Sequence, residues 1–221
     1  MAAKPLVLAA VMLLVSIDAF AVPAPGTQQG AKLVGSDLVP IAANAFSTAL
    51  SSDGNTAILG GPYDNSSVGA AWIYTRSGGV WSQQGLKLVG TGAVGAAFQG
   101  WSVAISADGN TALVGGFYDN SQIGAVWVFT RTAGVWSQQG AKLTGSGEVG
   151  PGLFGNAVAI SADGNTALVA GYYDTNDSGA VWVFTRTGGV WSQQGAKLVG
   201  SGIAGVPFQG KSVSLSADGN T

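Results

Sequence analysis

The sequence predicts an all-β fold, a β-propeller-type array of four-stranded antiparallel blades with about three and a half blades present. Two observations support this prediction. The hexapeptide SSDGNT at 51–56 recurs as SADGNT at 106–111, 161–166 and 216–221, a spacing of 55 residues each time. Each period also contains several short apolar runs separated by Gly-rich turns. A fixed period of about 40 to 60 residues is typical of units that bury their faces against their neighbours.

The first two strands of a unit are predicted from the second period. Residues 101–106 have the period-two pattern of a strand, because Val103 and Ile105 alternate with small residues. One bulky and one small face suit an inner strand near a crowded axis. The Asp-Gly pair at 108–109 is expected to form a two-residue hairpin with both residues at positive φ. The chain then reverses into a second strand over 111–115.

The second half of the unit is predicted to contain a loop and two more strands. Residues 117–124 form a polar loop, and residues 125–131 form the third strand with Trp127 and Phe129 on one face. Both faces of this strand are apolar, so both are expected to be buried. The fourth strand spans 135–143, and its Gln-rich centre fits an outermost strand. The tryptophans of the third strand are therefore expected in the core between blades: Trp72, Trp127 and Trp182.

The units follow one another without a change of composition. Complete units lie near 46–90, 101–145 and 156–200, and a partial unit, expected to begin with a first strand, lies at 211–221. Closed propellers have about 4 to 8 blades. The missing blades are expected either from a longer chain or from self-association. A longer chain is favoured, because pairing two copies would join a first to a fourth strand without the two between them.

The N-terminus has the pattern of an export signal. Lys4 precedes an apolar run at 5–17, and Ala19-Phe20-Ala21 fits a cleavage site, so residues 1–21 are predicted to be a signal peptide. An apolar helix of this length spans about 20 Å, short of the roughly 30 Å hydrocarbon core. The repeats at 22–221 are therefore expected to be secreted, extracellular or periplasmic, with no membrane span after signal removal.

Composition excludes several classes of function. The formal net charge is −2, and no basic stripe follows the chain, so nucleic acid is not an expected partner. Histidine and cysteine are absent, which excludes Ser-His-Asp and Cys-His triads and His-ligated zinc. The only glutamate, Glu148, lies in a connector and has no matching acid in the other units. No enzyme activity is expected.

Several short motifs resemble the FG-GAP repeat, the blade type of the integrin α-chain propeller and of many exported bacterial proteins. These are Phe154-Gly155, Gly60-Gly61-Pro62 and the GAVWVFTR segments at 124–131 and 179–186. The segments at 98–100 and 208–210 are interpreted as Phe-Gly motifs with one inserted residue. The resemblance covers about residues 28–221. It implies a propeller that serves as an adhesion, ligand-binding or protein-interaction surface.

The resemblance also raises the question of calcium. Metal-binding members of the family have a longer Asp-rich hairpin that wraps calcium, an ion that needs about 6 to 8 oxygen ligands. Here each hairpin has one acid: Asp53, Asp108, Asp163 and Asp218. We therefore expect no metal site and no cofactor, and we interpret these aspartates as turn formers.

A second recurring acid follows a tyrosine in each unit. The ligand-binding candidates are Tyr63, Asp64, Asn65, Tyr118, Asp119, Asn120, Tyr173, Asp174 and Asp177. An exposed tyrosine beside a carboxylate and an amide could stack on a sugar, and Asp174 with Asp177 could hold a weak cation. The alternative is an Asx-type turn whose tyrosine packs against a neighbouring blade.

Recurring cations have a simpler interpretation. They are expected to be solvated guards of the sheet edges: Arg76, Arg131, Arg186, Lys32, Lys87, Lys142 and Lys197. The sequence thus favours an exported, non-catalytic propeller segment that binds an extracellular protein or glycan. The alternatives are a carbohydrate-binding or carbohydrate-active propeller, such as a lectin or glycoside hydrolase, and a pure scaffold within a longer protein.

Overall fold

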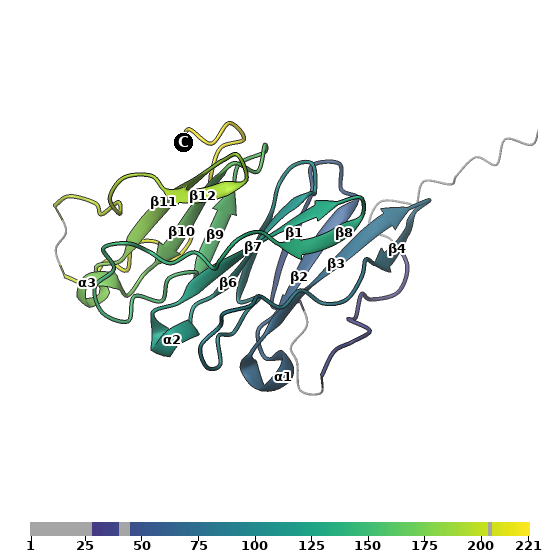
Figure 1. Cartoon of the computed structure of the whole chain (residues 1–221), viewed down its shortest axis with the longest axis horizontal. Coiled ribbons are helices and arrows are strands. Elements are labelled where there is room, and N and C mark those ends of the chain that lie inside the picture. Colours follow the sequence, from purple (N-terminus) through teal and green to yellow (C-terminus); the bar gives the residue numbers. More distant parts are fainter. Residues whose placement is uncertain (1–27, 40–44, 203–204) are drawn as a thin grey trace, which may run out of the picture. The chain divides into compact units, whose positions relative to one another are not determined.

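The computed structural model describes residues 28–39, 45–202 and 205–221 (Figure 1). The predicted signal peptide, residues 1–21, lies outside the described residues. The chain divides into a unit of residues 1–31 and a unit of residues 32–221. In the described part of the first unit, Gln28 Nε2 donates to the carbonyl of Gly30. All assigned strands and helices belong to the second unit. None of the described helices has the length and apolarity needed to cross a membrane.

The second unit contains three four-stranded antiparallel sheets, each a simple meander. The first sheet comprises β1 (Ser47–Leu50), β2 (Thr56–Gly61), β3 (Ala70–Ser77) and β4 (Val80–Gln83). The second comprises β5 (Ser102–Ile105), β6 (Thr111–Gly116), β7 (Ala125–Thr132) and β8 (Val135–Gln138). The third comprises β9 (Ala157–Ile160), β10 (Thr166–Gly171), β11 (Ala180–Thr187) and β12 (Val190–Gln193). One-turn helices follow the second strands: α1 (Asp64–Ser67), α2 (Asp119–Gln122) and α3 (Asp174–Asp177).

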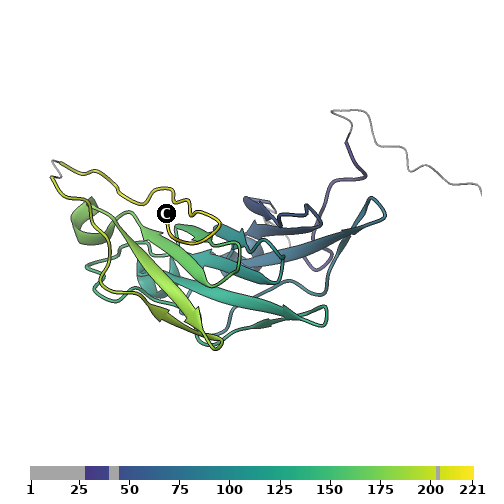
Figure 2. The same ribbon diagram turned by 90° about the horizontal axis from the view of Figure 1, so that it is seen from above.

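The three sheets pack face to face in chain order, as Figure 2 shows. Their first strands, β1, β5 and β9, lie next to one another, as the inner strands of propeller blades do. Val103 and Ile105 on β5 pack toward the first sheet, whereas the small Ala104 packs toward the third. The alternation of bulky and small residues therefore lets neighbouring blades converge. The predicted all-β, propeller-type fold is confirmed.

The third strands supply the largest core side chains. Trp72, Trp127 and Trp182 are completely buried, as predicted. Each indole lies beneath the connector that enters its unit. A Cβ atom on Gly90 would lie 2.0 Å from Trp127 Cδ1, so only glycine allows this approach. The Trp127 Nε1–H group donates to the carbonyl of Thr91 at 2.8 Å, which satisfies its buried donor.

The hairpins between first and second strands differ from the predicted two-residue turn. The link between β5 and β6 runs from Ser106 to Asn110, and the Gly109 N–H donates to the carbonyl of Ser106. Gly109 has φ +68°, but Asp108 is not among the residues with positive φ. The prediction that both residues adopt positive φ is therefore wrong. The aspartate instead ties the turn together through its side chain.

Two other segments also differ from their predicted form. The fourth strand β8 ends at Gln138, because Gly140 turns away with φ +74°, and only Leu143 rejoins the sheet, through a single bridge to Val126. Residues 211–216, predicted to be a first strand, contain no strand. A strand needs a hydrogen-bonded neighbour, and the described residues provide no second strand to pair with this segment.

Candidate functional site

Each unit contains a buried aspartate at the end of its second strand. Asp119 is 1% exposed, and one carboxylate oxygen accepts the Val94 N–H at 2.7 Å. Its other oxygen lies 2.5 Å from Lys142 Nζ. The same arrangement pairs Asp64 with Lys87 and Asp174 with Lys197. These three carboxylates are structural, so their predicted role as ligand contacts on the surface is wrong.

The three paired lysines were predicted to be solvated edge guards, and this prediction is also wrong. Their side chains are only 17 to 20% exposed. Lys87 and Lys197 also lie over the core tryptophans, 6.0 Å from the Trp72 ring and 5.9 Å from the Trp182 ring. An ammonium group in this position compensates the buried aspartate and covers the indole.

The recurring arginines contact the neighbouring unit. Arg131 Nη1 donates to Gln84 Oε1 of the first sheet at 3.0 Å, and Trp136 Nε1 donates to the same oxygen. The guanidinium group lies 5.4 Å from the Trp136 ring. Arg186 repeats the contact with Gln139 of the second sheet at 3.1 Å. Arg131 and Arg186 therefore connect adjacent blades, and their interpretation as solvated guards is wrong.

The buried aspartates hold unusual turns on the surface. Directly after Asp119, the three residues Asn120, Ser121 and Gln122 all have positive φ, between 50° and 74°. This left-handed conformation is costly for residues other than glycine. The Asn120 N–H donates to the carbonyl of Val94 at 3.0 Å, which helps to fix the turn. Asn65 and Asn120, two of the predicted ligand contacts, are consequently presented to solvent.

The tyrosines before these aspartates lie in a cluster of aromatic side chains at one end of the sheets. Tyr63, Tyr118 and Tyr173 are 38 to 39% exposed. We call these aromatic residues together the aromatic rim, and their ring contacts form two groups. The first group is Phe46, Tyr63, Phe98, Trp101, Phe117 and Tyr118, and the second is Tyr172, Tyr173 and Phe208. Trp101 is the centre of the first group, with the Phe46 and Phe117 rings each 4.4 Å away. The helices α1, α2 and α3 lie at the same end of the sheets (Figure 1).

The aspartates of the first hairpins lie away from the rim. In Asp53, Oδ1 accepts Ser51 Oγ–H at 2.6 Å and the Asn55 N–H at 2.9 Å, and Oδ2 accepts Asn55 Nδ2–H at 3.1 Å. These bonds hold the pKa of the Asp53 carboxyl below its usual value. Each aspartate therefore acts as a turn former. Within the described ranges, no three acidic side chains gather into a metal site.

A hollow of about 830 Å³ opens beside α2, and the sequence prediction did not identify it. Its lining is mostly polar or small: Asn120, Ser121, Ile123, Thr144, Gly145, Glu148, Gly150 and Pro151. A second hollow, of about 410 Å³, shares Gly150 and Pro151 with it and also contacts Tyr173, Asn176 and Asp177. The structure thus brings Tyr173 and Asp177 to one surface and separates them from the buried Asp174.

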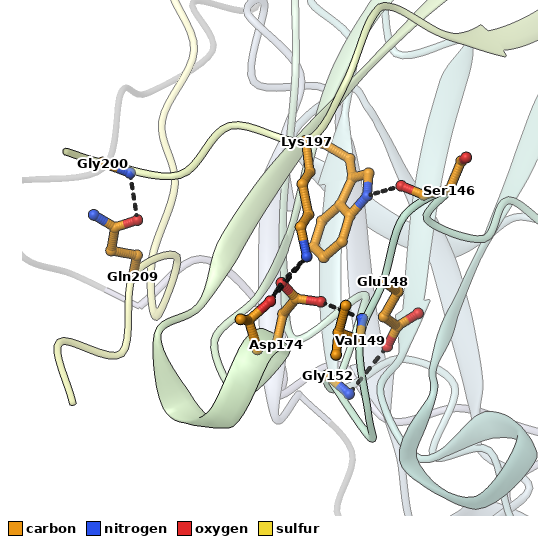
Figure 3. A network of polar contacts seen from close by, with 10 residues as sticks. Ser146, Glu148, Val149, Gly152, Asp174, Lys197, Gly200 and Gln209 are labelled. Carbon is orange, nitrogen blue, oxygen red and sulfur yellow. Dashed lines mark hydrogen bonds and ion pairs between the residues drawn. The ribbon is translucent and has the colours of Figure 1, made fainter. Parts of the chain in front are cut away.

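Glu148 lies on the connector that leads into the third sheet (Figure 3). Its Oε1 accepts the Gly152 N–H at 3.0 Å, and the next residue, Val149, donates its N–H to Asp174. Burial raises the pKa of Glu148 to about 7, and the charge of Asp174 adds to this effect. The Gly152 N–H and Lys197 act in the opposite direction. The sequence contains one signal for this site, an acid at a position that is apolar in the neighbouring repeats. The residues 55 positions before and after Glu148 are Ala93 and Ile203.

The register also changes the interpretation of the Phe-Gly motifs. Gln99, Phe154 and Gln209 form the same bridge, to Gly69, Gly124 and Gly179. Gln99 and Gln209 therefore occupy the position in their units that Phe154 occupies in its own, and no residue is inserted. The polar side chain of Gln99 is accommodated because its Oε1 accepts the Gly90 N–H at 2.6 Å and its Nε2–H donates to the Gly90 carbonyl at 3.0 Å. Phe154 instead contacts the Trp182 ring edge-on at 5.2 Å.

Comparison with known proteins returned no matching family profile and no significant match among curated proteins. Among solved structures, TolB from Acinetobacter baumannii is 13% identical, with a TM-score of 0.40 over 78% of this chain and 35% of TolB. Kuenenia stuttgartiensis hydrazine synthase is 17% identical, with a TM-score of 0.46 over 88% of this chain and 44% of that chain.

A third structure is that of a protein described as a 6-phosphogluconolactonase, from Bacteroides uniformis. It is 17% identical, with a TM-score of 0.48 over 69% of this chain and 39% of that chain. The present chain thus spans less than half the length of each of these structures. At this level of similarity the three structures carry no information about activity or ligand.

Proposed function

We propose that this chain is an exported, non-catalytic segment of an FG-GAP-like β-propeller, and that the aromatic rim is its adhesion or ligand-binding surface. The partner is an extracellular protein or a glycan. The observation that supports this proposal is the contiguous set of six partly exposed rings around Trp101, in which Tyr63 and Tyr118 are 38% and 39% exposed. Contiguous exposed apolar patches on proteins are typical of interaction sites.

The chemistry of the rim favours binding over catalysis. Asp119 and Asp174, two of the recurring acids, are buried in ion pairs with lysines. A glycosidase needs two carboxyl groups about 5 to 9.5 Å apart at the scissile bond. Aromatic rings, in contrast, supply large contact areas with little loss of side-chain entropy, which is what a binding surface requires.

The test is a binding screen on arrays of glycans and extracellular-matrix proteins. Substituting Tyr63→Ala together with Tyr118→Ala is expected to weaken any saturable interaction at least tenfold. Val135→Ala is the matched control, because Val135 is 68% exposed and lies at the opposite end of its sheet. Binding by the tyrosine variant at wild-type strength, or no saturable binding by the wild type, would contradict the proposal.

A second candidate function is a scaffold that continues the array, and the third sheet supports it. Its outward face carries Leu168, Val183 and Leu198, and Leu198 is 56% exposed. The equivalent residues Leu113 and Val128 of the second sheet are fully buried by the next blade. A hollow of about 640 Å³ lies between this face and the C-terminal segment, which contributes Leu215, Gly219 and Thr221 to its lining. The strands that would follow this segment in a further sheet of the same type therefore fit over the rest of the face.

The scaffold function predicts self-association through this face. In sedimentation velocity experiments, the weight-average mass is expected to rise with concentration. Val183→Lys is expected to keep the protein monomeric, because it places a charge in the new interface. A Val183→Lys variant that associates as strongly as the wild type would contradict the role of this face, whereas a monomeric wild type would leave a longer chain as the source of the next blade.

A further inference from the structure

Glu148 has a carboxyl group that pairs with no lysine or arginine among the described residues. It accepts a hydrogen bond from the Gly152 N–H. Lys197, the cation whose charge acts on Glu148, is itself paired with the buried Asp174. A partly buried carboxylate without a cation is unfavourable, because part of its hydration is lost. A cation supplied by a ligand would compensate this cost.

The position of Glu148 is not required for the fold of a unit. The same connector position holds Leu38 in the first unit and Ala93 in the second. Both of these side chains pack against apolar core clusters. Glu148 instead lines the hollow beside α2. The third unit thus replaces a packing residue by a charged residue that faces a cavity.

The hollow is built to accept a polar molecule. Its volume of about 830 Å³ lies within the range of about 300 to 1,000 Å³ that is typical of ligand sites. Asn120, Ser121 and Thr144 add amide and hydroxyl groups to the carboxyl group. Asn120 and Ser121 belong to the left-handed turn, which the buried Asp119 holds in place. These polar groups are therefore positioned before any ligand arrives.

The adjoining hollow extends the same surface. It adds the exposed ring of Tyr173 and the carboxyl group of Asp177. The charges packed around both hollows are two neutral pairs, Asp119–Lys142 and Asp174–Lys197. The ionised carboxylates of Glu148 and Asp177 therefore give the groove a net negative charge, and the partly exposed ring of Tyr173 lines the same hollow as Asp177.

We propose that this groove binds a small organic cation through a primary ammonium group, with Glu148 as the residue that receives the charge. Asn120, Ser121 and Thr144 accept or donate hydrogen bonds to the rest of the molecule. Two classes of ligand have such primary ammonium groups: oligomers of amino sugars and linear polyamines. The site uses only Tyr173 of the aromatic rim, so it does not depend on the rim being a binding surface.

The test is isothermal titration calorimetry with three probes: a glucosamine tetramer, its fully N-acetylated counterpart and spermidine. The wild-type protein is expected to bind at least one of the two amines and to bind the acetylated tetramer at least tenfold more weakly, because acetylation removes the charge. Tetramer binding alone identifies the saccharide as the ligand class, and spermidine binding alone identifies the polyamine. Equal binding of the two tetramers, or no binding of either amine, would overturn the proposal.

Variants at position 148 separate a ligand role from a structural role. Glu148→Ala recreates the residue of the second unit, so it is expected to fold, and Glu148→Gln keeps the size of the side chain. Both are expected to weaken amine binding at least tenfold. Val135→Ala, at the other end of its sheet, is the control and is expected to bind as the wild type does. Unchanged affinity in Glu148→Gln would contradict the assignment.

The pH dependence gives an independent readout. A linear polyamine stays protonated near neutrality, since primary amines have pKa values of about 10. Its affinity is therefore expected to rise between pH 6 and pH 8, as Glu148 loses its proton, and to level off above that range. In Glu148→Gln the affinity is expected to be flat over this range. If the affinity rose equally in the wild type and in Glu148→Gln, another titrating group would be the cause, and the role of Glu148 would be contradicted.

Discussion

At the scale of single residues, each unit is organised around one buried carboxylate. Asp119 accepts a hydrogen bond from Val94, which lies 25 residues earlier in the connector, and forms an ion pair with Lys142, which lies 23 residues later. A buried charge is tolerated only when it is paired and hydrogen-bonded. The Asp–Lys pair therefore specifies how the connector, the turn and the outer segment of a unit come together.

This role predicts a large effect of removing one partner. Asp119→Ala is expected to lower the free energy of unfolding by about 3 kcal/mol, because Lys142 stays largely buried without a counter-charge. Urea denaturation followed by circular dichroism measures the change. The double variant Asp119→Ala with Lys142→Met should recover part of the loss, since it removes both charges. A double variant less stable than the single one would contradict this explanation.

Glu148 predicts a pH dependence of stability with the opposite sign to that of a salt-bridged acid. Its pKa is raised from 4.5 to about 7 in the folded protein, so the folded state holds the proton more tightly. Stability is therefore expected to fall as the pH rises from 4.5 to 7, and then to level off. Because the carboxyl group is only partly buried, solvent screening limits the change to about 1 kcal/mol. Thermal unfolding of Glu148→Gln should give a flatter pH profile.

At the scale of elements, the turns after the second strands each contain three consecutive non-glycine residues with positive φ. In the first unit, Asn65, Ser66 and Ser67 have φ values of 48°, 55° and 68°. A left-handed residue other than glycine costs about 1 to 2 kcal/mol. Such a run persists because the buried aspartate before it and the glycine after it are both fixed, as the Gly69 N–H donates to the carbonyl of Asp64.

Relief of this strain can be measured at one exposed residue. Ser66→Gly is expected to raise the free energy of unfolding by about 0.5 to 1 kcal/mol, because glycine adopts positive φ freely, although it has more entropy in the unfolded chain. Ser66→Ala keeps the strain and is expected to give no gain. Melting temperatures of the two variants provide the comparison. Equal melting temperatures would show that the turn is not strained.

The sequence predicts the strands of this protein better than its turns. The alternation around Val103 and the apolar run around Trp127 specify their strands locally, so both could be read directly from residue types. The left-handed turn at Asn120 could not, because it depends on hydrogen bonds to Val94, which lies in a distant connector. The aromatic residues could be identified as candidates, but the burial of Asp119 depends on a lysine 23 residues away.

At the scale of the molecule, neighbouring blades are joined by apolar faces and by side-chain hydrogen bonds. The face of the second sheet that packs on the first carries Trp127 and Phe129, and Arg131 reaches Gln84 across the same boundary. The backbone adds a contact near the inner strands, where the Ala107 N–H donates to the carbonyl of Ala162. The 55-residue period predicts this stacking, because every repeated sheet can place its outward face against the opposite face of the next sheet. It does not predict the arginine contacts, which depend on side chains at two different positions.

The stacking order predicts that the same substitution lowers stability by different amounts at equivalent positions of the second and third sheets. Val128 is fully buried between the second and third sheets, whereas Val183, 55 residues later, lies on the outward face of the third sheet. Val128→Asp is expected to cost about 4 kcal/mol or more, because it buries an unpaired carboxylate. Val183→Asp leaves its carboxylate near water and is expected to cost less than about 1 kcal/mol. Urea denaturation of both variants at low protein concentration measures the difference, and equal losses would show that the two faces are covered to the same extent.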